Sequence, residues 1–209
     1  MSLRDESQVP NLSRFFRTGG GQYGYGDQFL GIKVPVTRSV VGRYWNQVGF
    51  PQIEQCVTSP YHEIRLAALL TLVKRYECSL SNSEREAQVQ FYLSHTDYVN
   101  NWDLVDMSCY KLLGHWLLDK DRTVLYQLAH NNAHLWEQRI AIGSTMQFIR
   151  HQQFDDTFQI ADILLNHHHD LIQKATGWLL REVGKRDKSA LVAFLEKRYR
   201  FMPRTMLRS

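Results

Sequence analysis

Cysteine is scarce in this chain of 209 residues, which has three, at positions 56, 78 and 109. An odd number at wide spacings argues against a disulfide framework and against a cysteine zinc site. No apolar run approaches the ~18–20 residues that a membrane span needs. The opening, Met-Ser-Leu-Arg-Asp-Glu, lacks the apolar segment of a signal peptide. We therefore expect a cytoplasmic protein with reduced thiols and no membrane segment.

Proline is nearly confined to the beginning of the chain. Four of the five prolines lie at or before Pro60, and the fifth is Pro203. Residues 61–202 can therefore form helices without interruption. Alternating strand patterns are also lacking. Apolar residues instead recur at steps of three and four through residues 61–76, 135–149 and 171–183, and Ser83 followed by Glu86 fits a capping box. The sequence predicts an all-α fold.

Three helical segments resemble one another, and each places a basic residue before small and aliphatic ones. Arg65, Arg139 and Lys174 are spaced by 74 and 35 residues, which is two periods of about 37 and one of 35. A further unit near 102–114 fills the gap. This period predicts HEAT-like repeats in a single domain over 1–209, stacked into a curved solenoid with a concave basic face. We expect residues 1–11 to be disordered or a remnant of expression.

The net charge of +4 is distributed unevenly along the chain. Residues 1–170 hold 15 Lys/Arg and 18 Asp/Glu, whereas residues 171–209 hold 10 and 3. A basic final segment favours contact with phosphates, and a solvated helix face is an equally good interpretation of charge alone.

The segment Asn101-Trp-Asp-Leu-Val-Asp106 carries the sharpest candidate site. On a helix, Trp102 and Asp106 lie on one face, where an indole ring and a carboxylate can hold a cationic group between them. The alternative is that Trp102 belongs to the core and that one aspartate caps a helix. Trp178 follows Gly177, a residue that would let a flat partner approach the helix backbone.

Two other segments are better explained by structure than by chemistry. The glycine-rich run over 19–26 lacks the pattern of a phosphate-binding loop, so we interpret it as a flexible loop between helical units. The run His167-His-His-Asp170 does not place ligands on one helix face, so a turn between repeats is favoured over a metal site. No nucleophile motif is present, and we expect neither a metal nor a cofactor.

Six motifs in order resemble the AlkD family of DNA alkylation repair proteins, which are HEAT-like-repeat DNA glycosylases. They run from about Leu12 to Arg208 and read Arg14-Phe-Phe-Arg-Thr-Gly19, Phe29-Leu-Gly-Ile-Lys-Val-Pro35, Trp102-Asp-Leu-Val-Asp106, Leu135-Trp-Glu-Gln-Arg139, Lys174-Ala-Thr-Gly-Trp-Leu-Leu-Arg-Glu182 and Met202-Pro-Arg-Thr-Met-Leu-Arg208. The resemblance favours a functional role for Trp102 and Asp106.

The resemblance implies a monofunctional, metal-free enzyme of base excision repair, acting at the bacterial nucleoid. Such an enzyme releases cationic N3- and N7-alkylated purines from duplex DNA and leaves an abasic site. Its catalytic residues map to Trp102, Asp106, Arg139 and Trp178. A DNA-binding relative with weak activity and a HEAT scaffold for a protein partner remain alternatives. We expect a monomer whose basic tail contacts the DNA backbone through Lys174, Arg181, Lys185, Arg186, Arg204 and Arg208.

Overall fold

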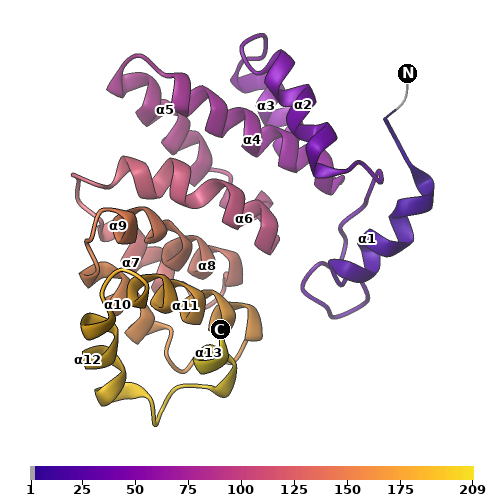
Figure 1. Ribbon diagram of the computed structural model, residues 1–209. Coiled ribbons are helices and arrows are strands. Elements are labelled where there is room, and N and C mark those ends of the chain that lie inside the picture. The colour runs from indigo at the N-terminus through magenta and orange to yellow at the C-terminus, as the bar shows by residue number, and fades with distance from the viewer. Residues whose placement is uncertain (1–2) are drawn as a thin grey trace. The chain divides into compact units, whose positions relative to one another are not determined.

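The protein is all-helical in a computed structural model that describes residues 3–209 (Figure 1). Over this range there is no strand, and a single isolated bridge joins Gln28 to Tyr61. The predicted all-α fold is therefore confirmed. The chain divides into two compact units, the first ending at Ser108 and the second formed by Cys109–Ser209. The curvature of the array, its concave basic face and a single domain over 1–209 stay predictions.

The first unit is built around the long helix α4, which packs against α2, α3 and α5. Leu66 and Leu72 of α4 are fully buried, and Ile53 and Val57 of α3 lie in the same core. The elements of this unit are η1 (Glu6–Gln8), α1 (Val9–Phe15), α2 (Val34–Tyr44), α3 (Phe50–Val57), α4 (His62–Cys78), α5 (Asn82–Leu93), η2 (Thr96–Tyr98) and α6 (Trp102–Cys109), whose last residue belongs to the second unit.

Helix α5 begins at the N-cap Ser81, two residues before the predicted cap. The Glu84 amide donates to Ser81 Oγ, and the Leu80 amide donates to Glu84 Oε2. The predicted cap at Ser83 was wrong. Two overlapping Ser-x-x-Glu patterns are present, and the earlier one starts the helix because Ser81 adopts the extended backbone of an N-cap.

The N-terminal segment is helical where the sequence favoured disorder. Asp5 caps η1 by accepting the Ser7 amide, and its own amide donates to the Leu30 carbonyl. The glycine-rich loop joins α1 to α2, as predicted, but it packs closely, since a Cβ on Gly24 would lie 2.2 Å from the Phe16 carbonyl oxygen. Residues 1 and 2 of the segment expected to be disordered lie outside the described range.

The second unit is built around α8 and α11, which pack against each other. Helix α8 also packs on α7, and α11 packs on α10, α12 and α13. Ile140, Ile172 and Leu179 are fully buried. The elements are the π turn η3 (Tyr110–Gly114), α7 (Thr123–His130), α8 (Leu135–Ser144), α9 (Met146–Arg150), α10 (Asp155–Ile163), α11 (Asp170–Gly184), α12 (Lys188–Arg198) and α13 (Arg204–Arg208).

The helices recur as the sequence predicted. Pairs α3–α4, α7–α8 and α10–α11 each pack together, and α6 begins the helical repeat expected near Trp102. The helix expected over 135–149 divides at Thr145 into α8 and α9. The hydroxyl groups of Ser144 and Thr145 donate to the carbonyls of Ile140 and Ile142, a pattern that bends helices.

Candidate functional site

Trp102 and Asp106 lie one turn apart on α6 and therefore share a face, as predicted. Both are half-buried. The Trp102 amide donates to Asn101 Oδ1 at 2.9 Å, which fixes the start of the helix. Its indole stacks on Phe16, with ring centroids 5.7 Å apart, and meets the edge of Phe15 at 5.8 Å. Helix α1 thus holds one side of the indole.

An apolar cleft of about 280 Å³ adjoins Trp102 within the first unit. Its wall includes Phe15, Phe16 and Met107, and Lys33 supplies a positive charge at the same cleft. Phe15 is 62% exposed although it is aromatic. A half-exposed indole beside exposed aromatic surface is suited to contact with a flat or apolar group.

A buried polar network lies behind Trp102, and its centre is His62 on α4. Nε2 of His62 lies 2.8 Å from Asp103 Oδ2, and Nδ1 lies 3.2 Å from Asp27 Oδ2. Asp27 also accepts from Arg65 Nη2 and from Asn101 Nδ2. A neutral imidazole donates from only one ring nitrogen, so two carboxylate partners favour the imidazolium.

The charges in this network stabilise one another. Burial alone would lower the pKa of His62, but the hydrogen bonds to Asp103 and Asp27 outweigh it and raise the pKa to about 9. Burial works against the charged form of Asp27, yet its bond to His62 and the charge of Arg65 hold the pKa of this carboxyl below its usual value. His62 is therefore cationic at neutral pH. The first aspartate of the Trp102–Asp106 motif is a structural partner of His62.

The free energy of unfolding is expected to fall as pH rises through the titration of His62. The group is charged in both states below pH 6.5 and stays charged only in the folded state up to about pH 9, so its contribution is fully present below 6.5 and is lost by about 9. The difference between the two pKa values corresponds to roughly 3 kcal/mol in the free energy of unfolding. Urea titrations at pH 6 and pH 9.5 measure it. The His62→Gln variant should lack this loss, and an equal loss in the variant would contradict the assignment.

Glu63, the next residue on α4, is a second buried anchor and is 4% exposed. Its carboxylate accepts the amides of Leu30, Gly31 and Ile32 at 2.9–3.2 Å. Gly31 has a φ of +79°, and a Cβ there would lie 1.8 Å from the Asp5 carbonyl oxygen. Glu63 thus fixes the segment that carries Lys33 to the cleft.

Arg139 and Trp178 belong to the second unit. Arg139, on α8, is 6% exposed, and its Nη1 donates to the Leu171 carbonyl at 2.6 Å. Trp178, on α11, is half-buried. Gly177 beside it is covered by the chain itself, because a Cβ there would lie 2.2 Å from the Met206 carbonyl oxygen. The expected approach of a flat partner at Gly177 was wrong, since α13 occupies that place.

The basic residues of the final segment differ in their partners. Lys174 pairs with Asp170, and Lys185 and Arg186 both pair with Glu182. Arg181 is exposed, as are Arg204 and Arg208.

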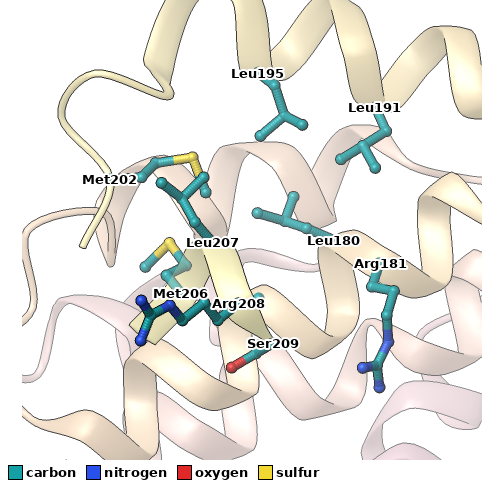
Figure 2. A pocket seen from close by; sticks show the side chains of 10 residues that line it. Leu180, Arg181, Leu191, Leu195, Met202, Met206, Leu207, Arg208 and Ser209 are labelled. Carbon is teal, nitrogen blue, oxygen red and sulfur yellow. The ribbon is translucent and has the colours of Figure 1, made fainter. Parts of the chain in front are cut away.

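Arg181 and Arg208 border an apolar pocket of about 290 Å³ between α11, α12 and α13. Figure 2 shows Leu180, Leu191 and Leu195 around this pocket, with both guanidinium groups lying away from the leucines. These cations are therefore directed to the surface of the second unit.

The repeated basic residues do not all face solvent. Arg65 is 3% exposed, donates to the Ser59 carbonyl and pairs with Asp27, so the expectation that it lines a positive face was wrong. Lys174 is exposed. A basic side chain at this repeat position can be held in the core when a neighbouring loop supplies a carboxylate.

The histidine run is a turn between α10 and α11, as predicted. His167 bonds Gln138 Oε1 at 2.8 Å, and His169 Nδ1 accepts the Leu171 amide as the cap of α11. Burial lowers the pKa of His167. Among residues 3–209, no cluster of three or more His, Cys, Asp or Glu side chains is arranged to hold a metal ion.

The repeated helix pairs, with an aromatic cleft beside a buried ionic network in the first unit, define a helical-repeat protein. The chain belongs to the family described as DNA alkylation repair enzyme, whose model matches residues 1–209. This finding confirms the resemblance seen in the motifs and gives the protein a role in DNA repair, with DNA as its substrate.

The fold is also similar to that of a solved protein described as a "Predicted DNA alkylation repair enzyme from Enterococcus faecalis". The similarity has a TM-score of 0.74 at 16% identity and covers 100% of this chain and 95% of that one. No curated protein matches the chain. No helix within residues 3–209 is long and apolar enough to cross a membrane.

Proposed function

We propose that the protein is a monofunctional DNA glycosylase that hydrolyses the N-glycosidic bond of cationic N3- and N7-alkylated purines in duplex DNA. The observation that carries this proposal is the placement of Trp102 and Asp106 on one face of α6, with the indole held by Phe16. Membership of the DNA alkylation repair family supports it.

The chemistry needs few catalytic groups. An alkylated purine is already a cation, so its departure requires no general acid. The C1′–N bond breaks, its electron pair leaves with the neutralised purine, and positive charge develops on the sugar. A water molecule then adds to C1′ and loses a proton. An abasic site and the free base are the products, and neither a metal nor a cofactor is required.

Each candidate residue has a role in this proposal. Asp106 stabilises the developing charge on the sugar and accepts the proton of the water. Trp102 presents a flat face to the deoxyribose and favours the cation, and Trp178 is assigned an aromatic contact with the DNA from its motif. Arg139 holds a phosphate, with a guanidinium group oriented by its bond to the Leu171 carbonyl.

The test is release of methylated purine from alkylated duplex DNA by the purified protein. We expect release well above the spontaneous rate. No release above that rate would reject the enzymatic proposal. Salt-dependent binding without release would instead indicate a DNA-binding relative, and the absence of both would favour a protein scaffold.

DNA affinity is expected to depend on the exposed arginines of the second unit. The Arg181→Gln variant should bind every duplex more weakly, because one phosphate contact is lost. The slope of log affinity against log salt should decrease by about 0.9. Fluorescence anisotropy at several salt concentrations measures this.

Lys120→Gln is a matched control for loss of one positive charge. Lys120 lies over Trp116 at 4.1 Å and pairs with Asp119. We expect it to leave the slope unchanged. An equal decrease in both variants would show that total charge, and not the position of Arg181, determines affinity.

A further inference from the structure

Three paths of contact lead from His62 to Trp102, and all of them lie inside the first unit. The first link is the bond from His62 to Asp103, the residue that follows Trp102. Phe16 is the second link, because its ring lies 4.6 Å from the imidazole, in a tilted arrangement, and stacks on the indole at 5.7 Å. The His62 side chain is 2% exposed, so any effect on bound DNA has to pass through its neighbours.

A third path runs through the backbone. Asp27 accepts from His62 and from the Asn101 side chain, and Asn101 in turn accepts the Trp102 amide. Asn101 is fully buried. The start of α6 is therefore fixed by the same carboxylate that binds His62.

We propose that His62 is a positioning residue for Trp102, holding the first turn of α6 through Asp103 and the indole through Phe16. This proposal rests on the proposed function for the part that Trp102 plays in excision. His62 acts as a cation with one carboxylate on each ring nitrogen. The charged groups that surround it are Asp27 from the loop before α2, Asp103 from α6 and, beyond Asp27, Arg65 from α4.

Loss of the proton from His62 has a defined consequence. The neutral ring keeps one N–H, so one of the two carboxylates loses its donor in a buried site. If Asp103 is the one released, the first turn of α6 loses its tie to α4. Since the pKa of His62 is raised to about 9, this change falls in mildly alkaline solution.

The first test observes Trp102 in the free protein. The indole N–H resonance of Trp102, assigned by its disappearance in Trp102→Phe, is followed by NMR from pH 6 to pH 10. We expect it to shift together with the His62 ring protons, with a midpoint near 9. In His62→Gln this shift should vanish. A Trp102 resonance that stays fixed through the His62 titration would overturn the proposal.

The second test measures excision. We expect His62→Gln to lower the single-turnover rate of excision about tenfold, while DNA affinity stays within about twofold because His62 touches no phosphate. His95→Gln is the matched control, since His95 is a partly buried histidine of the same unit that stacks on Phe91 and is not one of the partners of His62 named above. It should retain the excision rate. Equal losses in the two variants would show a merely structural role.

The two tests separate this inference from the proposed function. If the wild-type protein releases no base, the glycosylase proposal fails, and the NMR titration still decides whether His62 positions Trp102. If the protein excises alkylpurines and the Trp102 resonance does not follow His62, the glycosylase proposal stands and the positioning role is rejected.

Discussion

The Asp106→Asn variant is expected to lose base excision by about 100-fold or more while it still folds and binds DNA. The substitution keeps the shape of the side chain and removes its charge, and that charge is proposed to act where positive charge develops on the sugar. Asp106 is half-buried on α6, on the face that it shares with Trp102. Single-turnover release of methylated purine from alkylated duplex DNA gives the rate.

A measurement of DNA affinity distinguishes a slower excision step from weaker binding of the substrate. Removal of a negative charge near the DNA backbone should leave affinity unchanged or raise it. The control is Asp119→Asn, because the Asp119 side chain is 82% exposed in a loop of the second unit. It should excise at the wild-type rate. An Asp106→Asn protein with full activity would remove the carboxylate from the mechanism.

The Glu63→Ala variant is expected to lower the free energy of unfolding of the first unit by about 3–5 kcal/mol. The change leaves the amides of Leu30, Gly31 and Ile32 without their acceptor, and each stranded buried donor costs about 1–3 kcal/mol. Such a loss is a large part of the ~5–15 kcal/mol that stabilises a typical domain. Urea unfolding followed by far-ultraviolet circular dichroism measures it.

Two further variants make this result specific. Glu63→Gln keeps one carbonyl oxygen as acceptor, so its loss should lie between those of the wild type and of Glu63→Ala. Glu77→Ala removes an exposed carboxylate from the end of the same helix and should change the free energy by less than ~0.5 kcal/mol. If all three variants matched the wild type, the anchor would contribute nothing to stability.

The helical content could be predicted from sequence because it rests on local patterns. The spacing of apolar residues located α4 and α11 to within a few residues of their ends. Local patterns also explain the errors. Ser81 and Ser83 both fit a capping box, and only the backbone distinguishes them. The break at Thr145 depends on hydroxyl groups that turn inward.

The network behind Trp102 could not be predicted from one sequence. His62 is separated from Asp27 by 35 residues and from Asp103 by 41. No spacing rule connects residues at such distances, and their types are common on solvated surfaces. Arg65 illustrates the consequence, because the repeat pattern suggested an exposed cation and the fold provides a buried partner. Trp102 and Asp106 could be found because a helix places neighbours one turn apart on one face.

The Trp102–Asp106 motif holds two aspartates with different environments. Asp103 is 5% exposed and tied to His62, whereas Asp106 is half-buried on the face that it shares with Trp102. The substitutions found among homologues should therefore differ between the two positions. Under the proposed function, a descendant that exchanged Asp106 alone would lose excision, while exchange of Asp103 would be tolerated only with a compensating change at His62. Paired substitution at 62 and 103, independent of position 106, is the pattern that a comparison of such lineages would reveal.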